Sequence, residues 1–86
     1  MNIKKITVFK STNCKACNKY EDTLNKLEGI DITVLNITED DKALEYARSY
    51  GINVVPTTII FKEDTDDIKH VLTGYFNKET IMKYID

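Results

Sequence analysis

The 86-residue sequence is short of several residue types, and the shortages exclude several classes of protein. It contains two cysteines, one proline, one histidine and no tryptophan. Two cysteines three positions apart cannot form the disulfide framework of a small secreted protein. No apolar run approaches the roughly 18 residues of a membrane-spanning helix. No block of basic residues indicates a nucleic-acid partner. We therefore expect neither membrane insertion nor nucleic-acid binding.

The composition is typical of one globular domain over residues 1–86. The sequence is 42% hydrophobic and 30% charged, with a net charge of −2, which is unlike a disordered chain. The N-terminal segment Met1–Lys5 carries charge but lacks the apolar stretch and small-residue cleavage site of a signal peptide. We therefore expect a cytoplasmic protein, acting as a monomer.

Four segments have the composition of β-strands, at residues 3–9, 30–37, 58–61 and 68–73. The second segment is almost continuously apolar, which is typical of a strand covered on both faces. The last two segments are separated by an acidic turn at residues 63–67. This turn is too short for a helical crossover, so it predicts an antiparallel hairpin.

Three segments are predicted to be helices. The first lies between the cap candidates at residues 11–13 and Gly29, the second is Glu39–Tyr50 capped by Thr38, and the third follows Asn77. The order β-α-β-α-β-β-α predicts an α/β protein with a four-stranded mixed sheet flanked by three helices. The helical side chains expected to face the core are Cys17, Tyr20, Leu24, Leu27, Ala43, Leu44, Ala47, Tyr50, Ile81 and Ile85.

The motif Cys14-Lys15-Ala16-Cys17 lies where the first strand gives way to the first helix, a position typical of a redox pair. The helix N-terminus favours the Cys14 thiolate, and Lys15 and Lys10 add positive potential, so we expect a lowered pKa for Cys14. Cys17 begins the buried stripe, so we expect it to be less exposed and more protonated. Cys14 is therefore predicted to attack a target disulfide, and Cys17 to resolve the mixed disulfide.

A metal site is the alternative interpretation of the two cysteines. They supply half of a zinc site, and His70, the only histidine, is expected on the fourth strand, remote from the helix end. The context therefore favours redox chemistry, and we predict no metal ligands.

Three segments together resemble the thioredoxin–glutaredoxin family. They are Cys14–Cys17 after the first strand, Tyr50–Thr57 before the third strand, and Gly74 after the fourth. The resemblance implies a thioredoxin fold with sheet order 2-1-3-4 and with the first and last helices on one face. It also implies a cis peptide bond before Pro56, opposite the cysteines. The expected substrate-binding residues are Asn13, Lys15, Val55, Pro56, Thr57, Gly74 and Tyr75.

Two departures from the family pattern concern the cysteines. Asn13 stands before the first cysteine, where many thioredoxins have tryptophan, and Lys15-Ala16 replaces Gly-Pro between the pair. Val8 stands where many thioredoxins bury an aspartate that accepts a proton. We therefore expect water, or a carboxylate that the sequence does not identify, to take the proton from Cys17.

The activity that this resemblance implies is the reduction of protein disulfides. It needs no cofactor besides the redox-active disulfide of Cys14 and Cys17. The electron donor is a thioredoxin-reductase-like enzyme or glutathione. The alternatives are a glutathione-dependent glutaredoxin and two non-enzymatic roles, a thiol-based carrier of metal or iron–sulfur clusters and a peptide-binding module.

Overall fold

Seven elements follow one another in the predicted order, in a computed structural model that describes residues 3–86. They are β1 Lys5–Lys10, α1 Lys15–Leu24, β2 Asp31–Asn36, α2 Asp41–Ser49, β3 Thr57–Phe61, β4 Ile68–Thr73 and α3 Lys78–Ile85. Residues 1 and 2 lie outside the described residues. They begin both the segment Met1–Lys5 and the predicted domain over residues 1–86. Within the described part of the chain, no helix is long and apolar enough to cross a membrane.

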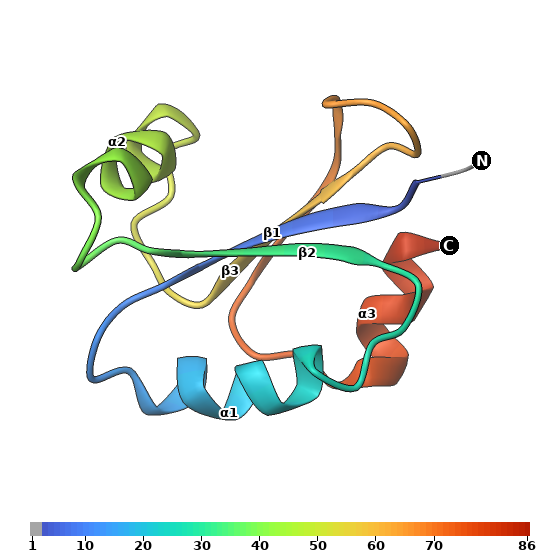
Figure 1. Ribbon diagram of the computed structural model, residues 1–86, viewed down its shortest axis with the longest axis horizontal. Coiled ribbons are helices and arrows are strands. Elements are labelled where there is room, and N and C mark those ends of the chain that lie inside the picture. The colour runs from blue at the N-terminus through green and yellow to red at the C-terminus, as the bar shows by residue number, and fades with distance from the viewer. Residues whose placement is uncertain (1–2) are drawn as a thin grey trace.

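The four strands form one mixed sheet in the order β2-β1-β3-β4 (Figure 1), which confirms the predicted order. β1 pairs in parallel with β2 and antiparallel with β3, and β3 and β4 form the predicted antiparallel hairpin. Phe9, near the end of β1, lies opposite Thr57 at the start of β3. The chain that leaves β1 toward the cysteines therefore begins beside the chain that enters β3.

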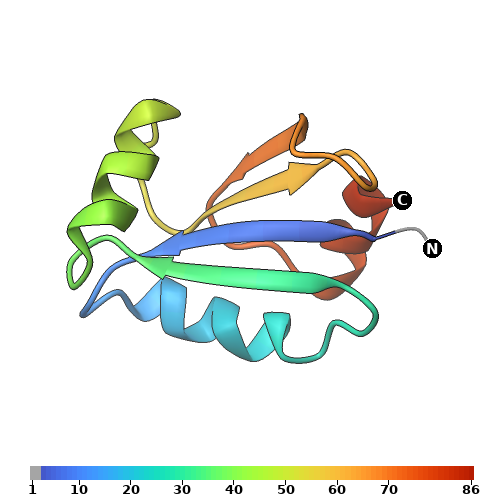
Figure 2. The ribbon, with the colours of Figure 1, turned by 45° about the horizontal axis from the view of Figure 1, so that its top comes forward.

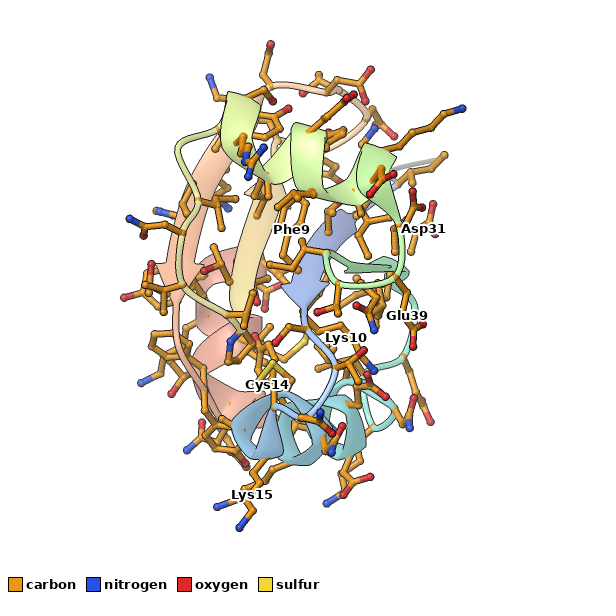
Figure 3. The ribbon with its side chains drawn as sticks, turned by 90° about the vertical axis from the view of Figure 1, so that its left-hand side faces the viewer. Phe9, Lys10, Cys14, Lys15, Asp31 and Glu39 are labelled. Atoms are coloured by element: carbon orange, nitrogen blue, oxygen red, sulfur yellow. A yellow bond between two sulfur atoms is a disulfide. The ribbon has the colours of Figure 1, made fainter. Side chains whose placement is uncertain are left out.

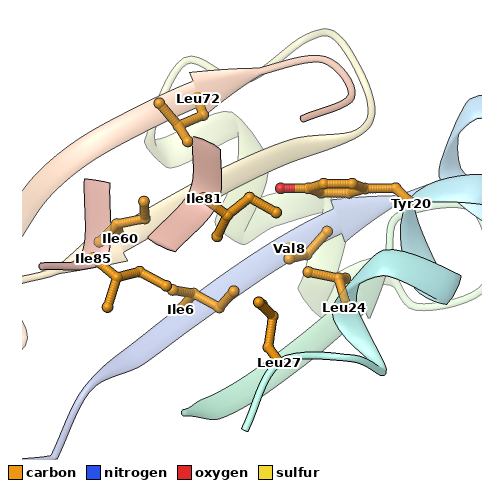
Figure 4. Close-up of a cluster of buried hydrophobic side chains, with 9 residues drawn as sticks. All are labelled: Ile6, Val8, Tyr20, Leu24, Leu27, Ile60, Leu72, Ile81 and Ile85. Atoms are coloured by element: carbon orange, nitrogen blue, oxygen red, sulfur yellow. The ribbon is translucent and has the colours of Figure 1, made fainter. Parts of the chain in front are cut away.

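Helices α1 and α3 cover one face of the sheet and α2 covers the other (Figures 1 and 2), as the resemblance implies. Alternate side chains of a strand point to opposite faces, so β1 contributes to two clusters. The first cluster, on the side of α1 and α3 (Figure 4), contains Ile6, Val8, Tyr20, Leu24, Leu27, Ile60, Leu72, Ile81 and Ile85. The second, on the side of α2, contains Phe9, Ala47, Ile59 and Phe61.

A buried hydrogen bond crosses the first cluster. The hydroxyl groups of Tyr20 and Thr58 share it, at 2.7 Å, and both residues are buried. Burial disfavours the phenolate and so raises the pKa of Tyr20. The bond satisfies two polar groups that would each cost free energy if buried alone.

The edge strand β2 is covered less completely than predicted. Its apolar pattern predicts cover on both faces, but Val34 is 42% exposed. Both faces of the strand still carry apolar contacts, because Ile32 packs against the first cluster and Leu35 against the second. The cover is therefore partial, on a strand that pairs only with β1 within residues 3–86.

The start and end of α2 also differ from prediction. Asp40 caps the helix, and its carboxylate accepts a hydrogen bond from the backbone N–H of Lys42 at 2.9 Å. Thr38 is not the cap, because the side chain of Asn36 accepts its N–H at 2.9 Å in the preceding turn. Tyr50, expected in the core, follows the last helical residue and is 40% exposed.

The predicted start of α3 is confirmed, whereas α1 ends earlier than predicted. Asn77 caps α3, its side chain accepts the N–H of Thr80 at 2.9 Å, and Ile81 and Ile85 are buried, all as predicted. The regular part of α1 ends at Leu24, before the predicted stop at Gly29. Gly29 has a φ of +72°, a left-handed conformation that glycine adopts without strain.

Val8 lies in the first cluster with 2% of its surface exposed. Val8→Asp should therefore lower the free energy of unfolding by more than about 1 kcal/mol, because it buries a polar group without a partner. Val71→Asp, on an exposed strand position, is the matched control and should cost less. Urea titrations of both variants measure the difference. Equal losses would show that burial at Val8 does not decide the cost.

Candidate functional site

The two cysteines lie at the start of α1, where a disulfide joins them (Figure 3). Their Cα atoms are 5.2 Å apart, within the usual range for a disulfide. The prediction that one of residues 11–13 caps the helix is wrong, because Cys14 is the cap. Its Sγ accepts a hydrogen bond from the backbone N–H of Cys17 at 3.1 Å. Asn13, at a φ of +62°, turns the chain into this position.

The two sulfur-bearing residues differ in access to solvent, as the sequence predicts. Cys17 is 1% exposed and belongs to the buried side of α1, whereas Cys14 is half-buried. A reagent approaching the end of the helix would therefore meet Cys14 first. The cap position also places Cys14 among the unpaired N–H groups of the first turn, which favour negative charge.

The segment that enters β3 lies at the same end of the sheet. The peptide bond between Val55 and Pro56 is cis. Pro56 and Thr57 are buried, and the Thr57 hydroxyl donates a hydrogen bond to the carbonyl of Val54 at 2.5 Å. Val55 is half-buried, and no hydrogen bond within residues 3–86 involves its backbone. Its N–H and carbonyl therefore have no partner in the described part of the chain.

The segment that leaves β4 is tied to Pro56 and to α1. The N–H of Gly74, whose φ is +102°, donates a hydrogen bond to the carbonyl of Pro56 at 2.8 Å. The ring of Tyr75 stacks edge-on against Tyr20, with 5.7 Å between centroids, and its hydroxyl shares a 3.1 Å hydrogen bond with Thr23. Tyr75 therefore joins this segment to the helix that carries the cysteines.

A hydrogen-bonded network fixes the loop before Cys14. The Thr12 N–H donates to the Thr38 hydroxyl at 3.2 Å, and the Thr12 hydroxyl donates to the Glu39 carboxylate at 3.4 Å. The Asn36 side-chain amide in turn donates to the Thr12 hydroxyl at 3.4 Å. These contacts hold the loop against the turn between β2 and α2.

The two lysines expected near Cys14 are placed differently from one another. Lys15 is exposed and points away from the sheet (Figure 3). Lys10, expected to add positive potential at Cys14, instead forms an ion pair through its Nζ with the carboxylate of Glu21 on α1. Sequence reasoning missed Glu21, although its position four residues after Cys17 was a usable signal, because such residues are neighbours on a helix.

His70 lies on β4, as predicted, and its ring stacks against Tyr84 with 5.0 Å between centroids. Among residues 3–86, no group of three or more His, Cys, Asp or Glu side chains is placed to hold a metal ion.

Known proteins share this architecture. A family model described as a thioredoxin-like domain matches residues 2–86. A thioredoxin domain-containing protein of Acanthamoeba polyphaga mimivirus is 30% identical over an alignment of 70 residues, and the match covers 79% of this chain and 20% of that protein. The chain thus spans about a fifth of the length of this relative.

Solved structures of other proteins share this fold. An uncharacterized thioredoxin-like protein from Clostridium perfringens has a TM-score of 0.81 and 26% identity, over 96% of this chain and 68% of that chain. Thioredoxin 1 from Thermosipho africanus has a TM-score of 0.76 and 24% identity, over 94% of this chain and 89% of that chain. With a family match over nearly its whole length, the chain belongs to the thioredoxin-like domain family.

Proposed function

We propose that this protein is a dithiol–disulfide oxidoreductase that reduces disulfides in other proteins. The observation that carries the proposal is the unequal exposure of the two linked cysteines, since Cys14 is half-buried and Cys17 is 1% exposed. A reaction through a mixed disulfide needs one accessible sulfur to attack and one protected sulfur to resolve. This pair has both properties within one turn of helix.

The reaction starts from the reduced pair. The Cys14 thiolate, at the cap of α1, attacks one sulfur of a substrate disulfide, and the other substrate sulfur leaves with the electron pair of the broken bond. The Cys17 N–H, which lies 3.1 Å from the Cys14 Sγ in the disulfide form, supports the negative charge of the attacking sulfur. Cys17 then attacks Cys14, the second substrate sulfur leaves, and the Cys14–Cys17 disulfide remains.

The substrate of this reaction is an extended peptide segment that carries a disulfide. The free backbone groups of Val55 suit pairing with an extended strand, the mode in which main-chain hydrogen bonds supply affinity. Pro56, Thr57 and Gly74 would form the floor of this docking site, because a hydrogen bond ties Gly74 to Pro56. The exposed residues Asn13, Lys15 and Tyr75 would border it.

A donor must return two electrons to the disulfide after each cycle. We propose a thioredoxin-reductase-like enzyme, with glutathione as the alternative donor. The segment Tyr50–Thr57 supports the first choice through its resemblance to thioredoxins. We also propose that the protein acts as a cytoplasmic monomer.

The assignment of the two sulfurs predicts opposite results for two serine variants. Cys17→Ser should accumulate mixed disulfides with substrate proteins through Cys14, because nothing resolves them. Cys14→Ser should accumulate none, because the remaining thiol is buried. Non-reducing electrophoresis of each variant after incubation with oxidised insulin measures the trapping. Trapping by Cys14→Ser alone would reverse the assignment.

The donor is tested by insulin-disulfide reduction under two conditions. With NADPH and a thioredoxin reductase, the wild-type protein should precipitate the insulin chains through many turnovers. With glutathione alone, the rate should stay close to that of a blank without protein. The double variant Cys14→Ser/Cys17→Ser is the control. Turnover with glutathione and none with the reductase would assign the protein to the glutaredoxin type of chemistry.

A further inference from the structure

The resolving step leaves one proton without an obvious acceptor. Cys17 must lose its thiol proton to attack, yet Val8 beneath α1 is apolar and packs in the first cluster with Tyr20 and Leu24 (Figure 4). The Tyr20 hydroxyl is engaged by Thr58, and burial raises its pKa, so the phenol stays neutral near pH 7 and is not a base. The acceptor must therefore lie elsewhere around Cys17.

Glu21 stands one helical turn after Cys17. Each residue of an α-helix turns the chain by about 100°, so Glu21 lies about 40° from Cys17 around the helix axis. Tyr20 lies on the other side of Cys17. Its side chain is 37% exposed and is held by Lys10, whose own side chain is 22% exposed. Asp22, the other carboxylate on α1, is exposed and lies about 140° from Cys17 by the same geometry.

An open pocket connects Glu21 with solvent. It has a volume of about 230 Å³ and lies between α1 and β2. Its lining residues are Glu21, Leu24, Asn25, Ile32 and Val34. Glu21 is the only charged residue of this lining. Other charged or titratable groups near the start of the helix include Lys10 on β1, Tyr20 and Lys19 on α1 itself, Tyr75, which stacks on Tyr20, and Glu39, which accepts a hydrogen bond from Thr12. Among these groups Glu21 and Glu39 are the carboxylates, and Glu21 alone lies on α1.

We propose that the Glu21 carboxylate accepts the proton of the Cys17 thiol in the resolving step, directly or through one water molecule. The inference rests on the proposed function. In this step the Cys17 Sγ bonds to the Cys14 Sγ while the bond between Cys14 and the substrate sulfur breaks. The substrate sulfur leaves as a thiolate with the electron pair of that bond. The proton passes from Cys17 to Glu21 and then through the pocket to solvent, where it neutralises the released thiolate.

The test follows the two stages with an aromatic disulfide, dithiobis-nitrobenzoate, which releases one coloured thionitrobenzoate when Cys14 attacks and a second when Cys17 resolves. Glu21→Gln should leave the first release unchanged near pH 7 and slow the second by about a hundredfold, the lower end of a typical general-base effect. The deficit should shrink as the pH rises, because hydroxide then removes the Cys17 proton without help. A role limited to folding would not produce this pH dependence.

Two controls separate the carboxylate from the ion pair. Asp22→Asn, on the exposed side of α1, should release both thionitrobenzoates at wild-type rates. Lys10→Gln breaks the same ion pair but keeps the Glu21 carboxylate, so it should slow the second release much less than Glu21→Gln. Glu21→Asp should recover part of the lost rate.

Each remaining outcome is decisive. An unchanged second release in Glu21→Gln overturns the inference and leaves the proposed function intact. Equal slowing by Lys10→Gln and Glu21→Gln also overturns it, because the ion pair would then act only through structure. A wild-type protein that never makes the second release contradicts the proposed function itself.

Discussion

The hydrogen bond from the Cys17 N–H to the Cys14 Sγ is the contact on which the site depends. It makes a cysteine the cap of α1, so the sulfur that begins the helix also meets its unpaired amides. The same turn places Cys17 three residues further on, where the helix faces the sheet and is shut off from solvent. One local geometry therefore produces both the bond between the sulfurs and their difference in access.

Three other features of the fold surround the cysteine pair. The pairing of Phe9 with Thr57 brings the entry to β3 next to the exit from β1. The Gly74–Pro56 hydrogen bond adds the segment after β4. Beneath α1, the apolar Val8 keeps the first cluster free of charge, and the ion pair of Lys10 with Glu21 is part-buried outside that cluster. Burying a charge is costly, so this arrangement favours stability of the core.

Much of the fold follows from the sequence, and the failures have specific causes. Apolar periodicity predicts the seven elements because the sheet and helices bury most of these side chains. It overestimates the burial of Tyr50 and Val34, because periodicity does not show where a helix ends or which strand lies at the edge of the sheet. Capping rules miss Cys14 because a sulfur acceptor is not among the usual caps. The position of Glu21 four residues after Cys17 is visible in the sequence, but its pairing with Lys10 depends on how α1 packs against β1.

We propose that the end of α1 makes Cys14 reactive and protects Cys17. The most direct measurement is alkylation of the fully reduced protein with a limiting amount of iodoacetamide near pH 7, with the modified position identified by mass spectrometry over time. Cys14 should be modified first, and Cys17 should react slowly even after Cys14 is blocked. Modification of Cys17 before Cys14, or of both at the same rate, would contradict it.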